Sequence, residues 1–148
     1  MNTIKINPIG FVKRKSREEN DKDRSLISKI IINENLTKAL DGIDEFSHIY
    51  VIFWMDEIKD NNYLHHPGNI HDSDPIGIFA TRAPIHPNPI GLTLTELVKR
   101  KDNVLWVKGL DALDDTPILD IKPYPDWEHG KCIIVDDFRV PKWLKKKS

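Results

Sequence analysis

The stretch from Ile76 to Leu97, IGIFATRAPIHPNPIGLTLTEL, decides how this chain folds. It opens on a strand-like pattern at residues 76–82, passes through three prolines, and resumes a strand-like pattern at residues 92–97. Each proline fixes its own φ and biases the residue before it toward extended backbone. We therefore expect two strands joined by a stiff, non-helical loop. The loop carries three polar side chains: Arg82, His86 and Asn88. The pattern leaves open whether this loop only stiffens a β-protein or carries function.

Short apolar runs recur on both sides of this stretch and predict further strands. They lie at residues 5–12, 26–32, 48–55, 104–110 and 118–121. The run HIYVIFWM at residues 48–55 is continuously apolar, which is typical of a strand buried on both faces at the centre of a sheet. In the run at 104–110 we expect Val104, Trp106 and Leu110 to share a face, with Lys108 as the exception.

Helix signals are few. Leu36, Leu40 and Ile43 have helical spacing and predict one short helix or turn before the strand at 48–55. Many short strands and little helix favour an all-β sheet that closes on itself.

Composition narrows the class of protein. The chain has 148 residues, enough for one domain with one sizeable core. Its 22 basic and 23 acidic residues exclude a protein that is basic all over, but they leave room for local basic patches. The lone cysteine, Cys132, excludes a disulfide framework and a cysteine-rich zinc site. No apolar run reaches the length of a membrane span and no signal-peptide pattern is present, so we expect a cytoplasmic protein with no membrane partner.

Three histidines, His65, His66 and His71, raise the question of a metal. They lie in a polar segment with proline and glycine and without a thiolate partner, whereas metal ligands need rigid support. We interpret the segment as a solvated loop and expect no metal.

Four motifs together resemble the TsaA-like family of S-adenosylmethionine-dependent tRNA methyltransferases. They are NPIGFV at 7–12, GIDEFSHIYVIFWM at 42–55, FATRAPIHPNPIGL at 79–92 and GLDALDDTPILDIKPY at 109–124. The resemblance thus covers about residues 7–124, and we expect a single domain over 1–148 with residues 125–148 docked on it as a tail. It implies a mainly β fold, a small closed β-barrel with a few short peripheral helices. It also implies a homodimer with the cofactor near the subunit interface, and methylation of the exocyclic amine of threonylcarbamoyladenosine in the tRNA anticodon loop.

The resemblance also implies where S-adenosyl-L-methionine binds. Arg82 matches a cofactor-binding position, where a guanidinium can grip a carboxylate through two hydrogen bonds; an ordinary ion pair is the alternative. Asp56 and Glu57 stand where the family often has a histidine-containing pair. The remaining matched positions are Leu92, Leu110, Asp111, Ala112, Leu113 and Asp114. For Leu92 the alternative is plain core, and for the aspartates it is an ordinary turn.

Candidate substrate contacts lie in the proline loop and in basic clusters. His86 stands where the family usually has arginine, beside Asn88. Lys99, Arg100 and Lys101, together with the cluster at residues 13–17, could contact phosphates, and solvated charge is the competing interpretation. Two other functions stay open: a non-catalytic module that binds the cofactor or RNA, and a methyltransferase acting on a small molecule.

Overall fold

The computed structural model describes residues 2–14, 25–55, 64–65 and 75–144. The chain divides into two compact units, one formed by Met1–Asp56 with Ile90–Tyr124 and the other by Glu57–Pro89 with Pro125–Ser148. Each unit is described by itself below. That residues 1–148 form a single domain with a docked tail therefore stays a prediction.

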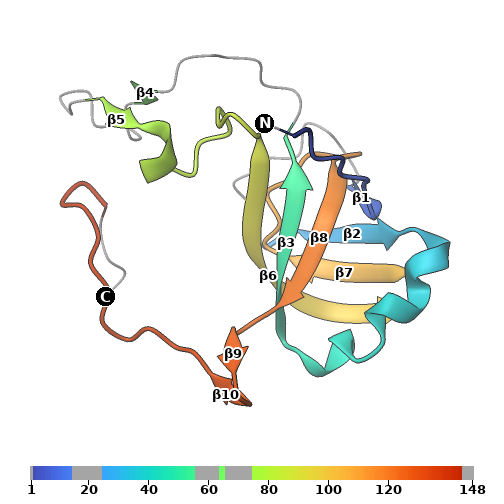
Figure 1. Ribbon diagram of the computed structural model, residues 1–148. Helices are drawn as coiled ribbons and strands as arrows, with labels where there is room; N and C mark the ends of the chain where they lie inside the picture. Colours follow the sequence, from blue (N-terminus) through green and yellow to red (C-terminus); the bar gives the residue numbers. More distant parts are fainter. Residues whose placement is uncertain (1, 15–24, 56–63, 66–74, 145–148) are drawn as a thin grey trace. The chain divides into compact units, whose positions relative to one another are not determined.

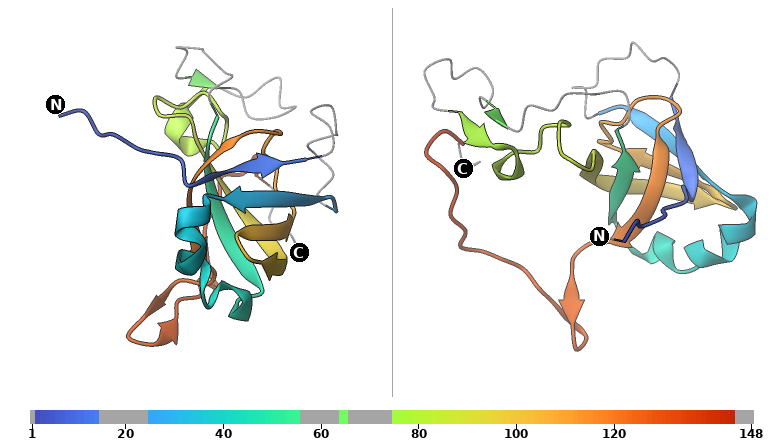
Figure 2. Two further views of the ribbon diagram at one scale, coloured as in Figure 1. Left: turned by 90° about the vertical axis from the view of Figure 1, so that its right-hand side faces the viewer. Right: turned by 45° about the horizontal axis from the view of Figure 1, so that its top comes forward.

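The first unit is a closed antiparallel barrel of six strands (Figure 1). In barrel order they are β1 (Gly10–Lys13), β2 (Ile27–Ile32), β7 (Val104–Lys108), β6 (Ile90–Lys101), β3 (His48–Trp54) and β8 (Pro117–Pro123). The barrel closes because β1 pairs with β2 on one side and with β8 on the other, as two further views also show (Figure 2). The prediction of a small closed β-barrel is confirmed.

Strand β3 shows how the barrel sorts its side chains. It pairs with β6 on one edge and β8 on the other, but every strand of a closed barrel pairs on both edges, so β3 holds no central place. Ile49, Val51 and Phe53 are buried, whereas Tyr50 and the other alternate residues are only half-buried. The prediction of burial on both faces was wrong, because a small barrel has one filled interior and its outer face is covered only in part.

Val104 and Trp106 share one face of strand β7, as predicted, but Leu110 does not join them. Leu105 and Val107 are fully buried, whereas Val104 and Trp106 are half-buried on the opposite face. Leu110 is buried but lies beyond the strand. The narrow interior takes aliphatic side chains that interdigitate with those of neighbouring strands, and the large indole of Trp106 packs outside between lysines.

Two short 3₁₀ helices connect β2 to β3, which confirms the predicted helical turn. They are η1 (Glu34–Leu40) and η2 (Ile43–Glu45). Leu40 is buried and joins the barrel core, and Leu36 and Ile43 pack against it. The connection therefore covers one end of the barrel with its apolar side chains.

The second unit contains the larger correction. The predicted strand at residues 76–82 is strand only at β5 (Ile76–Gly77), which pairs with β4 (Leu64–His65). A 3₁₀ turn, η3 (Ile78–Ala80), follows, because the Thr81 N–H and hydroxyl both donate to the Ile78 carbonyl at 3.0 and 2.8 Å. Local hydrogen bonds thus replace strand pairing. This unit also holds a small hairpin of β9 (Trp127–Glu128) and β10 (Lys131–Cys132).

The tetrapeptide NPIG occurs twice, at residues 7–10 and 88–91, and each copy leads into a barrel strand. A Cβ on Gly10 would lie 2.2 Å from the Ile31 carbonyl oxygen, and one on Gly91 would lie 2.3 Å from the Phe53 ring. In both copies glycine is required by close packing. None of the helices in the described residues could cross a membrane.

These contacts predict that alanine destabilises the barrel at both glycines. Gly91→Ala should lower the free energy of unfolding by about 1–3 kcal/mol, because the buried Phe53 ring must leave its rotamer. Gly10→Ala should lower the free energy of unfolding by at least the upper end of that range, since the backbone carbonyl of Ile31 cannot move away from the added Cβ. Denaturant unfolding measures both. Glu96→Ala, at an exposed position of β6, is the control and should change stability by less than about 0.5 kcal/mol; equal stability of all three variants would contradict the argument.

Candidate functional site

The connection from β7 to β8 carries most of the predicted cofactor positions. Gly109 begins it with a φ of 91°, which turns the chain out of the strand. Leu110 and Ala112 are buried, whereas Asp111 is exposed. Leu113 and Asp114 are half-buried. The segment thus anchors itself through alternate residues and presents Asp111 outward.

Arg14, the residue after β1, holds this segment in place. It is only 8% exposed, and its Nη1 donates to the Ala112 carbonyl at 2.8 Å. Its backbone N–H donates to Oδ1 of Asp114, also at 2.8 Å. Arg14 is therefore not a surface residue poised for phosphate, as its place in the basic cluster at 13–17 suggested. Residues 15–17 of that cluster lie outside the described part of the chain.

Asp114 and Asp115 have structural contacts of the kind expected of a turn. Oδ1 of Asp114 accepts the Arg14 N–H, and Asp115 donates its own N–H to the Val12 carbonyl at 2.9 Å. Asp115 has a φ of 62°, a left-handed conformation that a short polar side chain tolerates. The turn interpretation therefore accounts for part of the aspartate cluster, and it does so by tying the segment to β1.

Asp111 is held differently. The Thr93 hydroxyl donates to its Oδ1 at 2.5 Å, and Thr93 is itself 7% exposed on the inner side of β6. A carboxylate accepts several hydrogen bonds, so this oriented, exposed group has capacity for a hydroxyl or an ammonium. Leu92, one residue before Thr93, is 40% exposed on the outer side of the strand and is not a core residue.

The proline loop of the second unit carries Arg82, His86 and Asn88. The Nε2 of His86 lies 3.2 Å from the Thr81 carbonyl oxygen, and because a carbonyl only accepts, Nε2 carries the proton. The His86 ring also packs on Phe79 at 5.8 Å between centroids. Arg82 and Asn88 are exposed. His86 thus connects the proline loop to the preceding 3₁₀ turn and restrains the backbone around Arg82.

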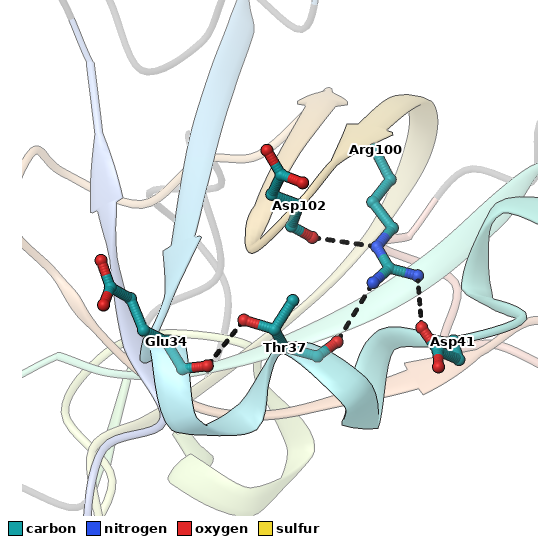
Figure 3. Close-up of polar contacts among 5 residues, drawn as sticks. All are labelled: Glu34, Thr37, Asp41, Arg100 and Asp102. Carbon is teal, nitrogen blue, oxygen red and sulfur yellow. Dashed lines mark hydrogen bonds and ion pairs between the residues drawn. The ribbon is translucent and has the colours of Figure 1, made fainter.

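Lys99, Arg100 and Lys101 divide between two faces of β6. The Arg100 guanidinium reaches across to η1, where it bonds the Asp41 carboxylate and the Thr37 carbonyl, both at 3.1 Å (Figure 3). Its Nε donates to the Asp102 carbonyl at 3.0 Å. Lys99 and Lys101 are exposed on the other face. Arg100 therefore fastens a helix to the barrel, and the two lysines face solvent.

Some predicted positions lie in parts of the chain that the structure does not describe. Asp56 and Glu57 lie outside the described residues, as do His66 and His71. No group of three or more metal-ligating side chains occurs within residues 2–14, 25–55, 64–65 and 75–144. Arg82, His86 and Asn88 belong to the second unit and the other described site residues to the first, so a shared pocket stays a prediction.

The family model described as the tRNA-methyltransferase O N-terminal domain matches residues 13–127. The chain belongs to this family. The match includes the proline loop, the β7–β8 connection and five of the six barrel strands in full. The family predicted from the four sequence motifs is therefore confirmed.

Relatives of the tRNA-methyltransferase O family differ in length. A probable S-adenosyl-L-methionine-binding protein of Methanothermobacter thermautotrophicus is 39% identical over 82% of this chain and 90% of its own. The tRNA (adenine(37)-N6)-methyltransferase of Mus musculus is 38% identical over 66% of this chain but 23% of its own length. The crystal structure of TrmO from P. aeruginosa superposes with a TM-score of 0.73 at 26% identity, over 97% of this chain and 62% of that one. This chain thus spans less than two thirds of the mouse enzyme and of TrmO.

Arg14 and Thr93 are the site residues that sequence reasoning missed. Both follow from strand alternation: Val12 and Arg14 are buried, as are Gly91, Thr93 and Thr95. A period of two carried past the end of β1 would have placed Arg14 inside. The charged run around it hid this signal.

The Arg14 contacts predict a local loss of stability. Arg14→Ala should lower the free energy of unfolding by about 1–3 kcal/mol, because a charged donor is removed from a buried carbonyl. Amide exchange in residues 113–116 should rise with it. The neighbouring Lys13→Ala is the matched control, since the Lys13–Asp115 pair is long, at 3.6 Å, and exposed; it should stay within about 0.5 kcal/mol. Equal exchange in both variants would refute the role given to Arg14.

Proposed function

We propose that this chain transfers a methyl group from S-adenosyl-L-methionine to tRNA, at the exocyclic amine of the modified adenine 37. The observation that carries the proposal is the family match over residues 13–127. Relatives named for binding S-adenosyl-L-methionine and for methylating adenine 37 of tRNA support the cofactor and the substrate. Threonylcarbamoyladenosine as the modified base is the finer part of the proposal.

The candidate residues suit the chemistry of the cofactor. It offers a carboxylate and an ammonium on its methionine tail, a ribose diol and an adenine. Arg82 is an exposed guanidinium that could pair with the carboxylate. Asp111 is an exposed carboxylate that Thr93 orients and that could accept from a hydroxyl or the ammonium. Leu92 offers exposed apolar surface for a ring. Cation, anion and apolar surface are all present among the predicted residues.

Positioning is the work that these residues would do. The bound cofactor supplies a methyl group already activated by its sulfonium, so the protein needs no nucleophile of its own. Arg82 and Asp111 would hold the two polar ends and fix the direction in which the methyl faces. The Arg14 contacts would keep the β7–β8 connection rigid, because Ala112 and Asp114 are tied to β1. His86 would do the same for the proline loop through Thr81.

The finer parts of the assignment follow from the same family. We propose that the chain acts as a homodimer in the cytoplasm, with the cofactor near the subunit interface and without a metal. His86 and Asn88 would face the RNA from the proline loop, and Lys99 and Lys101 from β6. We give Arg100 the structural role that its contacts with η1 describe.

A non-catalytic module is the second candidate. Two relatives that this chain covers over 90% and 88% of their own length are named for binding S-adenosyl-L-methionine, whereas the chain covers 23% of the mouse tRNA methyltransferase. Transfer of labelled methyl from S-adenosyl-L-methionine to total tRNA separates the two functions. Cofactor binding without labelled tRNA would contradict the tRNA methyltransferase and favour the module or a methyltransferase acting on a small molecule.

Arg82→Ala should weaken cofactor binding by about 1.5–3 kcal/mol, because a charged hydrogen bond to the carboxylate is lost. Isothermal calorimetry with S-adenosyl-L-methionine measures this. Arg139→Ala removes an exposed arginine of the same unit and serves as the control, with unchanged affinity. If both variants bind as wild type does, Arg82 is not a cofactor ligand.

Methyl transfer should survive an excess of chelator. A sulfonium donor needs no Lewis acid, and no rigid cluster of ligands is visible in the sequence. The assay is labelled methyl transfer to tRNA before and after chelation. Activity that is lost on chelation and restored by zinc would mean that His65, His66 and His71 were misinterpreted.

A further inference from the structure

A row of side chains crosses four neighbouring barrel strands. Strand register pairs Lys13 with Lys29, Lys29 with Trp106, and Trp106 with Lys99. Each pair places its two Cα atoms directly opposite, so the four side chains lie side by side on the outer face of β1, β2, β7 and β6. We name these four residues the lysine–tryptophan row.

The row brings ammonium groups against an aromatic face. The Nζ of Lys99 lies 4.4 Å from the centroid of the Trp106 ring, and that of Lys29 lies at 5.7 Å. Both distances are within the range of cation–π attraction, about 6 Å. The three lysines are exposed and Trp106 is half-buried. The indole is thus held in place with a positive charge on either side.

The surroundings of the row are also basic. Lys101 and Lys108 lie on the same face in the adjacent pairs of β6 and β7. Among the described residues of this face, the acids are Glu96, opposite Lys108, and Asp115, which Lys13 contacts at 3.6 Å. A chain with 22 basic and 23 acidic residues thus gathers five lysines against two acids here.

We propose that the lysine–tryptophan row binds an unpaired stretch of RNA, with a base stacked on Trp106 and the flanking phosphates on Lys29 and Lys99. The inference rests on the proposed action on tRNA and adds a contact surface to it. Aromatic platforms between basic side chains bind single-stranded nucleic acid without reading its sequence. A base that stacks on the indole would displace Lys99 from the ring onto its own phosphate, a short movement for a flexible side chain.

The spacing of the row suits this partner. Neighbouring strands lie about 4.8 Å apart, so Lys29 and Lys99 emerge about 10 Å from each other with the ring between them. That leaves room for one nucleotide with a phosphate on each side. An acidic protein would satisfy the lysines but would bring no flat ring to the indole, so RNA accounts for both parts of the row.

The proposal predicts two separable effects on binding of a short, fluorescein-labelled, unpaired oligouridylate, followed by anisotropy across a salt series. For the double variant Lys29→Ala, Lys99→Ala, the fall of log affinity with log salt concentration should be less steep by about 1.4. Each phosphate contact on a single strand contributes about 0.7 to that steepness. Trp106→Ala should weaken binding about tenfold or more and leave the slope unchanged. Trp106→Phe, which keeps an aromatic face, should restore most of the affinity.

The matched controls are Lys38→Ala and Lys122→Ala, two exposed lysines of the same unit outside the row. Together they should leave affinity and slope nearly unchanged. A double control that lowers the slope as much as the double row variant would overturn the proposal, as would wild-type affinity in both row variants. Equal competition by polyglutamate and by unlabelled oligouridylate would also overturn it in favour of an acidic partner. Should Trp106→Ala fail to fold, the lysine double variant decides.

Labelled methyl transfer to tRNA on the same preparations keeps the two proposals apart. Suppose that the wild-type protein methylates tRNA and that the row variants bind RNA as tightly as wild type does. This result would refute RNA binding by the lysine–tryptophan row and leave the proposed function standing. If RNA binding depends on the row but the protein neither binds S-adenosyl-L-methionine nor methylates tRNA, the proposed function is refuted. RNA binding by the row is then supported.

Discussion

The pairing of β1 on both of its edges is the constraint on which the rest of the barrel depends. All four residues of Gly10–Lys13 pair with β2, and the first two, Gly10 and Phe11, also pair with β8, so the sheet is left without a free edge. The strand can approach this closely only because Gly10 has no Cβ against the Ile31 carbonyl. Closure then buries Val12 fully within the core.

The same short strand organises the candidate site. The inward-facing alternation of β1 continues one residue past the strand, to Arg14. The guanidinium and the backbone N–H of Arg14 hold the β7–β8 connection through Ala112 and Asp114. Val12 and Asp115 add a backbone hydrogen bond to this link. Asp111 is exposed, and the Thr93 hydroxyl orients its carboxylate. A rigid segment that presents one carboxylate is what binding by positioning requires.

The inner and outer faces of the barrel wall have different roles. Most inward side chains are aliphatic and fill the core, whereas the outward face of β1, β2, β7 and β6 collects lysines around Trp106. Arg100 shows how strongly the face decides the role. It lies between two exposed lysines in sequence, yet it turns to η1, where it donates hydrogen bonds to the Thr37 carbonyl and to the carboxylate of Asp41 at the helix C-cap, and its Nε donates to the Asp102 carbonyl of the following turn. Adjacent residues of one basic triplet therefore serve stability and surface charge separately.

The sequence by itself determined the family, the mainly β class and the approximate place of each barrel strand, because motifs, apolar runs and prolines are local signals. The partial burial of Trp106 and Arg100 was decided only by the tertiary structure. Each depends on which face of its strand meets the interior, and that is set by pairing with strands distant in sequence, such as β7 with β2. The 3₁₀ turn at Ile78–Ala80 likewise formed where a strand pattern stood, because the hydrogen bonds of Thr81 were available locally. A hydrophobic pattern shows that a segment has a buried face, but the partners across the barrel decide which face it is.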